Sequence, residues 1–445
     1  MSAGLTVRRH FGTDGVRGIA GEVLTAALAT SIGAAATLQC GGDRPRVLVI
    51  RDTRESGEML EAALAAGIAS AGGDVLLGGV LPTPAAPLLI GRLRFDLAAV
   101  ISASHNPYED NGIKFFGADA FKLSDATELA IEARLDAGPL ARPPRIGSIQ
   151  PLHGTGEDYL RALQERFDGL DLGGVSVVLD CANGATHRVA PEIFRRLGAT
   201  VTALADVPDG RNINDGCGST HTESLVAAMC AGDHDIGFAF DGDGDRLLAV
   251  DRTGALVDGD ELIALAARHL RAQDRLPGSG VVVTVMTNYG FHAAVREAGV
   301  QVATTQVGDR YVLEELRERG WGLGGEQSGH IIDMGFVASG DGIASALLTL
   351  EALAGGDLAE RNAMDKLPQR LVNVRVADRD AVMAADELLA ATERESTALQ
   401  GRGRVLVRAS GTEQLVRVMV EAPSEDEADE VCGRLVAIVE GRAAP

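Results

Sequence analysis

The stretch with the clearest chemical meaning is "DIGFAFDGDGDRLLAV" at 235–250, where an apolar run leads into three aspartates separated by glycines. Asp241, Asp243 and Asp245 can converge on one point, because glycine lets the backbone turn tightly. Two carboxylates about 4 Å apart repel each other by roughly 4 kcal/mol at an effective dielectric constant near 20. The cluster therefore predicts a bound cation, and carboxylate oxygens favour Mg²⁺ or Ca²⁺.

Other interpretations of this stretch explain less of it. An EF-hand loop needs glycine at its sixth position and glutamate at its twelfth, where this chain has Arg246 and Arg252. An aspartyl phosphatase with Asp241 as the nucleophile would use Asp243 but leave Asp245 without a role. A polar turn without a ligand is the remaining alternative, and the metal site is the interpretation that we favour.

A serine stands in a loop directly after a second apolar run. Ser104 follows "FDLAAVIS" and precedes His105, in a turn marked by Asn106-Pro107. His105 is a candidate base, but neighbouring side chains in an extended loop point apart, so we expect poor geometry for a Ser–His couple. From its position alone, Ser104 is better explained as an ordinary polar loop residue than as a catalytic one.

A third loop, in "WGLGGEQSGHIID" at 321–333, places polar side chains between glycines. Glu326, Ser328 and His330 suit a loop that binds the hydroxyls of a small polyol, with the carboxylate accepting two of them. A flexible surface turn explains the same composition.

A fourth short turn has the groups that bind phosphate. Backbone N–H groups, two hydroxyls and a guanidinium can surround an anion, and the stretch "RASGTEQLVRVM" supplies them from Arg408, Ser410, Gly411 and Thr412. Arg417, on the following strand, can add a second positive charge. Near the N-terminus, Arg17 in "FGTDGVRG" can bind a phosphate or pair with Asp14, and the pattern does not decide between them.

Helical and strand-like patterns alternate along the chain and position these loops. Three blocks of similar length each combine strands with helices, and a shorter tail has two strands around a turn and then a helix that begins with acidic residues. Proline and glycine clusters suggest boundaries between the blocks. We expect an α/β protein with three similar α/β domains and a smaller α+β C-terminal domain, with bounds at 1–150, 151–254, 255–367 and 368–445.

Composition excludes several classes of protein. The net charge of −22 argues against non-specific nucleic-acid binding, although local arginine clusters still allow phosphorylated substrates. No apolar stretch approaches the roughly 20 residues of a membrane-spanning helix, and "MSAGLTVRRHFGTDGVRG" lacks the apolar segment of a secretory signal. The five cysteines are scattered and odd in number, which favours a reducing cytoplasm over a disulfide framework.

Seven of these motifs in series resemble the α-D-phosphohexomutase superfamily: "FGTDGVRG", "ISASHNP", "NGIKF", "DGDGDR", "VGDRYV", "GEQSGH" and "RASGTE". The resemblance covers essentially the whole chain. In that family, three α/β domains and a smaller C-terminal domain each contribute one loop to a central cleft, and the same arrangement is implied here.

The resemblance also implies roles for individual residues. Ser104 would carry a phosphoryl group, and one Mg²⁺ would be bound by the three aspartates and an oxygen on Ser104. General acid/base catalysis is assigned to Lys114 of "NGIKF", with His330 and Arg17 as supporting candidates and Arg246 beside the metal loop. Lys114 is one of only three lysines, and a lysine has a tunable pKa where arginine does not.

The implied reaction interconverts glucosamine 6-phosphate and glucosamine 1-phosphate through a 1,6-bisphosphate, on the route to UDP-N-acetylglucosamine and peptidoglycan. A hexose 1,6-bisphosphate would prime the enzyme, and a homodimer is expected because relatives are commonly dimers. Gln327 favours the amino sugar, since glucose and mannose mutases usually have methionine there; those mutases remain the alternative. Gln414 and Ala409 stand where many relatives have proline, which affects the rigidity of the phosphate turn.

Two other classes of function remain to be tested. A non-catalytic sugar-phosphate-binding protein would keep the phosphate turn but would not need the serine and the three aspartates. A phosphatase would release inorganic phosphate to water.

Overall fold

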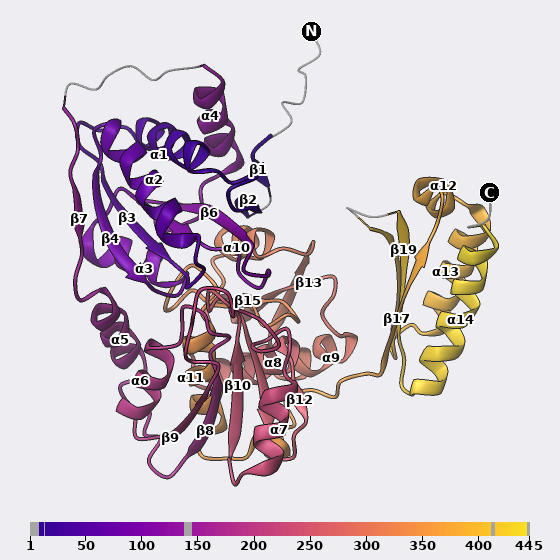
Figure 1. Ribbon diagram of the computed structural model, residues 1–445. Coiled ribbons are helices and arrows are strands. Elements are labelled where there is room, and N and C mark those ends of the chain that lie inside the picture. The colour runs from indigo at the N-terminus through magenta and orange to yellow at the C-terminus, as the bar shows by residue number, and fades with distance from the viewer. Residues whose placement is uncertain (1–8, 13, 138–144, 411–413, 443–445) are drawn as a thin grey trace. The chain divides into compact units, whose positions relative to one another are not determined.

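The computed structural model describes residues 9–12, 14–137, 145–410 and 414–442 (Figure 1). The chain forms two compact units. The first comprises Met1–Val285 and Gln301–Arg361, and the second comprises Met286–Val300 and Asn362–Pro445. Within the described ranges, no helix has both the length and the apolar character needed to cross a membrane.

The first domain is built on a seven-stranded sheet with the order β1-β2-β6-β5-β3-β4-β7. Strands β3, β4, β5 and β7 run parallel, and β6 returns antiparallel beside β5. β5 is buried along its whole length, which explains its continuous apolar sequence. The elements are β1 Phe11–Gly12, β2 Gly15–Ile19, α1 Ala26–Cys40, β3 Arg46–Arg51, α2 Gly57–Ser70, β4 Asp74–Val80, α3 Ala85–Leu93, β5 Leu97–Ile101, β6 Asp110–Gly117, α4 Asp125–Asp136 and β7 Ile149–Pro151.

The second domain repeats this plan in a five-stranded sheet with the order β12-β11-β10-β8-β9. β8, β9 and β10 are parallel, and β11 pairs antiparallel with β10. The elements are α5 Thr155–Arg166, β8 Ser176–Asp180, α6 Val189–Arg196, β9 Thr200–Leu204, α7 Glu223–Ala231, β10 Ile236–Phe240, β11 Leu247–Asp251 and β12 Leu256–Val257.

The third domain has a four-stranded sheet with the order β14-β13-β15-β16. β13 lies parallel to β14 and β15, and β16 pairs antiparallel with β15. The elements are α8 Gly259–Ala272, the 3₁₀ turn Pro277–Ser279, β13 Gly280–Thr284, α9 Tyr289–Glu297, β14 Gln301–Thr305, α10 Asp309–Arg319, β15 Leu323–Gly325, β16 Ile331–Asp333, α11 Gly342–Leu353 and the 3₁₀ turn Leu358–Glu360. Of these, α9 belongs to the second compact unit.

The C-terminal domain is an antiparallel three-stranded sheet, β17-β19-β18, covered by helices. α13 and α14 pack on one face of the sheet, where valines of β17 and β19 form the core. The acidic start of α14 was predicted from "PSEDEADE": the Ser424 side chain caps the helix by accepting the N–H of Glu427. The elements are β17 Gln369–Arg375, α12 Arg379–Met383, α13 Asp386–Ala398, β18 Arg404–Ala409, β19 Leu415–Glu421 and α14 Glu425–Gly441.

The expected fold class is confirmed, and the three α/β domains share one strand order. In each, two parallel strands precede a third parallel strand, a loop follows, and the chain returns on an antiparallel strand: β3-β4-β5-β6, β8-β9-β10-β11 and β13-β14-β15-β16. The loops after β5, β10 and β15 contain Ser104, the three aspartates and Glu326, respectively. Equivalent positions in three repeats therefore carry the three polar loops.

Candidate active site

The serine loop of the first domain contacts the aspartate loop of the second. Ser104 is 3 % exposed, and its Oγ donates a hydrogen bond of 2.6 Å to Oδ2 of Asp241. Its φ of +53° lies in the left-handed region, which typically costs a residue with a side chain about 1 kcal/mol or more. The structure therefore places the predicted phosphoryl carrier directly against the predicted metal ligands.

The three aspartates form a buried cluster in which one carboxylate oxygen of each lies within 4.8 Å of the others. Asp243 accepts hydrogen bonds from the Thr83 hydroxyl at 2.6 Å and from Lys114 Nζ at 2.8 Å. The Oδ1 atoms of Asp243 and Asp245 are buried without a hydrogen-bond partner. Buried carboxylate oxygens without donors are the groups that a cation would satisfy.

The electrostatics of the cluster support the same conclusion. Burial, followed by the charges of Asp245 and Asp243, raises the pKa of Asp241 well above its usual range. Burial opposes the charge of Asp245 as well, but His330, then Lys114 and Arg246, lower its pKa below the usual range. The ionised form of Asp241 is thus unfavourable here without a further positive charge, and the donor set fits a hard divalent cation.

Close backbone contact holds the two loops together. A Cβ atom on Gly242 would lie 2.5 Å from the carbonyl oxygen of Ser104, so any side chain there would push the loops apart. Gly329 of the third domain, with φ +89°, approaches the metal loop in the same way, since its Cβ would lie 1.9 Å from the carbonyl oxygen of Leu247. Glycines in "DGDGDR" and "GEQSGH" therefore allow three loops from three domains to meet.

His105 lies closer to Ser104 than we expected. Its Nδ1 is 3.2 Å from Ser104 Oγ, so the expectation that the two side chains point apart is wrong. That expectation assumed an extended loop, whereas the left-handed φ of Ser104 turns both side chains to one side. Burial, followed by the positive charges of Arg246 and Arg17, lowers the pKa of His105, which favours the neutral imidazole.

Lys114 is buried beside the aspartates and is held as an ammonium. Burial opposes its charge, but the carboxylates of Asp14, Asp243 and Asp245 outweigh that effect and raise its pKa. Lys114 was singled out because a lysine has a tunable pKa. While Ser104 carries a free hydroxyl, the surrounding carboxylates favour the charged form of Lys114.

A closed ring of alternating charges passes through Lys114. Lys122 Nζ lies 2.6 Å from Asp14 and also pairs with Asp309. The ring continues through contacts of 3.7 to 3.8 Å and links domains one, two and three: Lys114–Asp14–Lys122–Asp309–His330–Asp245–Lys114. Arg17 also pairs with Asp14, so the second of its two predicted interpretations, an ion pair, is the contact seen.

The predicted sugar loop is held by its neighbours. Glu326 is 8 % exposed and its Oε1 accepts the backbone N–H of Gly308 at 2.9 Å. Gln327 donates to Asp258 Oδ2 at 3.1 Å, whereas the Ser328 side chain is exposed. One carboxylate oxygen of Glu326 is thus engaged by the protein, and Ser328 is accessible to a ligand.

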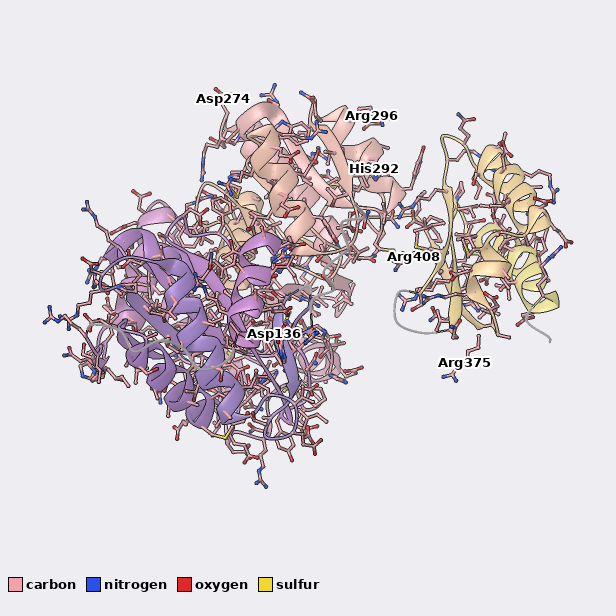
Figure 2. All side chains as sticks on the ribbon, turned by 90° about the horizontal axis from the view of Figure 1, so that it is seen from above. Asp136, Asp274, His292, Arg296, Arg375 and Arg408 are labelled. Atoms are coloured by element: carbon pink, nitrogen blue, oxygen red, sulfur yellow. The ribbon has the colours of Figure 1, made fainter. Side chains whose placement is uncertain are left out.

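Two arginines of the predicted phosphate turn stand opposite each other in the C-terminal sheet. Arg408 of β18 pairs in register with Arg417 of β19, on the face turned away from α13 and α14 (Figure 2). Burial, followed by the charge of Arg417, lowers the pKa of Arg408, and the Nε of Arg417 is buried without a hydrogen-bond partner. Facing like charges are unfavourable unless an anion lies between them. Ser410 donates its backbone N–H to Leu415, and the predicted ligands Gly411 and Thr412 lie outside the described residues.

Several residues of the site were not predicted from the sequence. Thr83 and Lys122 contact residues of the site from loops distant in the chain, and Asp309, the first residue of α10, lies in the motif "VGDRYV" but had been given no role. Lys122 had one signal, its presence as one of three lysines in an arginine-rich chain. Thr83 had none.

Comparison with known proteins identifies the family. Models of the phosphoglucomutase/phosphomannomutase family match the chain throughout: α/β/α domain I at 8–141, domain II at 157–254, domain III at 258–373 and the C-terminal domain at 371–438. The chain belongs to this family. It is a phosphohexomutase, an isomerase, as the motifs predicted.

Relatives of this phosphohexomutase are similar over their full length. A phosphoglucosamine mutase of Moorella thermoacetica is 51 % identical over 441 residues, which cover 97 % of this chain and 99 % of that protein. A phosphoglucomutase/phosphomannomutase family protein of Burkholderia thailandensis is 25 % identical, with a TM-score of 0.81 over 98 % of each chain. The fold is also that of N-acetylphosphoglucosamine mutase of Aspergillus fumigatus in complex with GlcNAc-6P and magnesium, at 19 % identity, a TM-score of 0.64 and 98 % and 96 % of the two chains.

Proposed function

We propose that this phosphohexomutase interconverts glucosamine 6-phosphate and glucosamine 1-phosphate, with Ser104 as the phosphoryl carrier. The observation that carries the proposal is the 2.6 Å hydrogen bond from Ser104 Oγ to Asp241, which sets a nucleophilic hydroxyl against three buried carboxylates. The amino sugar is proposed because the relatives at about half identity, such as that of M. thermoacetica, are phosphoglucosamine mutases.

The aspartate cluster is proposed as a Mg²⁺ site. Asp241, Asp243 and Asp245, together with an oxygen on Ser104, would hold the ion, which neutralises charge on the transferring phosphoryl group. The A. fumigatus relative that contains magnesium supports this choice of metal.

The reaction has two halves. In the first, O1 of glucosamine 6-phosphate attacks the phosphorus of phosphoserine 104; the P–O1 bond forms and the bond from phosphorus to Ser104 Oγ breaks. The 1,6-bisphosphate then turns round, and Oγ of Ser104 attacks the phosphorus at position 6, releasing glucosamine 1-phosphate. A hexose 1,6-bisphosphate would phosphorylate Ser104 before the first cycle.

Two groups are placed to move the protons. His105, 3.2 Å from Ser104 Oγ, would protonate Oγ in the first half and take the proton back in the second. Lys114 would take the proton from O1 in the first half and return it to O6 in the second. Between the halves Ser104 has a free hydroxyl, Lys114 is charged and His105 is neutral, which are the forms that the surroundings of the two residues favour. Arg17, Arg246 and His330 are assigned to charge stabilisation around them.

Binding of the sugar phosphate is assigned to the remaining predicted residues. Glu326 and Ser328 would accept and donate hydrogen bonds to the sugar hydroxyls. Arg408 and Arg417, with Ser410, Gly411 and Thr412, would bind the phosphate that is not reacting.

Because the five cysteines are free thiols, we propose a reducing cytoplasm as the site of action, on the route to UDP-N-acetylglucosamine and peptidoglycan.

The test compares initial rates with glucosamine 6-phosphate, glucose 6-phosphate and mannose 6-phosphate, each with Mg²⁺ and glucose 1,6-bisphosphate. We expect a large preference for the amino sugar; a preference for glucose or mannose would retain the phosphoserine chemistry and reject the substrate. Release of inorganic phosphate in place of an isomer would indicate a phosphatase.

The carrier is tested by Ser104→Ala. This variant should fold and bind Mg²⁺ but lose nearly all turnover, because no other hydroxyl contacts Asp241 in the described residues. Intact mass of the wild-type protein should show one added phosphoryl group after incubation with the bisphosphate, and none on the variant. An active variant would refute the mechanism.

A further inference from the structure

One buried arginine directs both terminal nitrogens of its guanidinium to carbonyl oxygens of the serine loop. The side chain of Arg54 is fully buried, and its Nη2 donates to the carbonyl oxygens of Ser104 at 2.8 Å and Asn106 at 2.9 Å. Its Nη1 donates to the carbonyl oxygens of Pro107 and Asp110, the latter at 2.9 Å. Arg54 therefore joins the beginning and the end of the loop 104–110.

A second chain of contacts leads from the same arginine to the backbone N–H of Ser104. Arg54 Nε donates to Asp52 Oδ2 at 2.8 Å, and the Ser102 hydroxyl donates to that same oxygen at 2.6 Å. Ser102 Oγ in turn accepts the N–H of Ser104 at 2.9 Å. Both peptide groups of Ser104 are thus held, its N–H through Ser102 and its carbonyl by Arg54.

These contacts matter because Ser104 adopts a backbone conformation that residues with side chains rarely take. Its φ of +53° must be imposed by its surroundings. The same conformation directs Oγ to Asp241, at 2.6 Å, and brings it near His105. Asn214 of the second domain is a second donor to the carbonyl oxygen of Ser104, at 2.9 Å.

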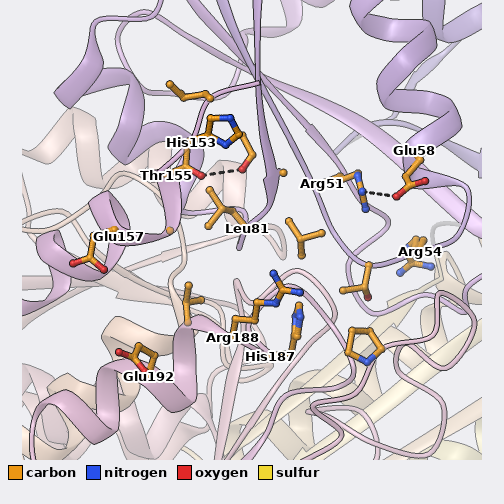
Figure 3. A pocket seen from close by; sticks show the side chains of 18 of the residues that line it. Arg51, Arg54, Glu58, Leu81, His153, Thr155, Glu157, His187, Arg188 and Glu192 are labelled. Atoms are coloured by element: carbon orange, nitrogen blue, oxygen red, sulfur yellow. Dashed lines mark hydrogen bonds and ion pairs between the residues drawn. The ribbon is translucent and has the colours of Figure 1, made fainter. Parts of the chain in front are cut away.

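The segment that contains Arg54 contacts both of the first two domains. Arg54 lies at the edge of a cavity of about 1060 Å³ between the first two domains, beside the Arg51–Glu58 ion pair (Figure 3). Thr53, the residue before it, donates its hydroxyl to the carbonyl oxygen of Asn183 across that boundary at 2.6 Å. The segment is therefore anchored in both domains.

We propose that Arg54, Asp52 and Ser102 are positioning residues that hold Ser104 in its left-handed conformation, so that its oxygen stays aligned for phosphoryl transfer. The inference rests on the proposed function of Ser104 as the phosphoryl carrier. Their hydrogen bonds go to one another and to the serine loop, not to the three clustered aspartates, so they act through the backbone of Ser104.

The experiment compares Ser102→Ala with Thr37→Val, which removes a buried hydroxyl bond from α1 of the same domain, far from Ser104 in the chain. Misplacing a reacting atom by about 1 Å can cost about 100-fold in rate. We expect Ser102→Ala to lower kcat, and the rate at which glucose 1,6-bisphosphate phosphorylates Ser104, by about 10- to 100-fold. KM for glucosamine 6-phosphate should stay within about twofold of the wild type, because the sugar contacts are unchanged. Thr37→Val should retain kcat.

Arg54→Lys extends the test, since lysine keeps the charge but cannot reach four carbonyl oxygens from a planar fork. It should lose at least as much kcat as Ser102→Ala; if it does not fold, Ser102→Ala decides. The inference is overturned if Ser102→Ala matches Thr37→Val in kcat, or if its KM rises as much as its kcat falls. A wild-type protein that isomerises no hexose phosphate and never becomes phosphorylated on Ser104 refutes the proposed function itself.

Discussion

Lys122 offers a quantitative test of the buried ring of charges. Its side chain is 11 % exposed and lies between Asp14, at 2.6 Å, and Asp309. Lys122→Met keeps the length of the side chain and leaves the two carboxylates without the cation between them. Removing one partner of a buried ion pair costs about 3 to 5 kcal/mol. Since Asp14 retains Lys114 and Arg17, we expect a loss of about 3 kcal/mol in the free energy of unfolding.

The assay uses the single tryptophan. Trp321 is buried with Val282 and Leu316 in the third domain, which also contains Asp309, so its fluorescence in urea follows the unfolding of that domain. Arg44→Met is the matched control: it breaks an ion pair with Asp74 in which the arginine is 49 % exposed. An exposed pair of this kind contributes less than about 1 kcal/mol.

A double variant separates the charge from the packing. Lys122→Met combined with Asp309→Asn removes the carboxylate that Lys122→Met leaves with only the more distant His330, and should recover at least about 1 kcal/mol relative to the sum of the single changes. Strict additivity, or a loss in Lys122→Met no larger than that in Arg44→Met, would refute the conclusion that the ring stabilises the contact between the first and third domains.

Three further predictions test other parts of the molecule. Burial raises the pKa of Asp341 to about 6, so the folded protein keeps a proton that the unfolded chain loses near pH 4. The free energy of unfolding should therefore fall by up to about 3 kcal/mol as pH rises from 4 to 6. Asp341→Asn should flatten that slope in urea titrations. Treatment with EDTA should stop turnover and lower the melting temperature, and added Mg²⁺ should restore both; a protein indifferent to EDTA would contradict the metal site. Arg417→Met should raise KM for the sugar phosphate at least about tenfold. The C-terminal domain should be equally or slightly more stable in this variant, because facing arginines repel by up to about 1 kcal/mol. An unchanged KM would exclude Arg417 from phosphate binding.

Much of the fold and part of the site follow from local sequence patterns. The apolar run before Ser104 is the buried strand β5, and the acidic segment after residue 423 begins α14. The three aspartates alternate with glycines, so their convergence could be predicted without knowledge of any other domain. These features depend on residues that are close together in the chain.

Contacts between distant residues could not be predicted in the same way. Lys122 meets Asp14 across 108 positions and Asp309 across 187, and no local pattern links them. The error at His105 has a different cause, because the left-handed φ of Ser104 depends on Arg54, which lies 50 positions earlier. A side chain's direction in a loop is set by whatever binds the backbone, and that partner is seldom a neighbour.

The repeated strand order explains why these long-range contacts are concentrated at one place. The loops after β5, β10 and β15 occupy equivalent positions in three sheets. A close contact at Gly242 joins the aspartate loop to the serine loop, and a close contact at Gly329 joins the loop after β15 to Leu247, which follows the aspartate loop. Once the loops meet, each contributes charge to the same small volume, and burial makes every unpaired charge costly. Lys114, Lys122 and Arg54 then serve one physical purpose, since each compensates carboxylates or carbonyl oxygens that the convergence of the repeats has removed from water. A repeat can supply the scaffold for a loop, but the compensating cations must differ from repeat to repeat, because Ser104, the aspartates and Glu326 each present a different charge.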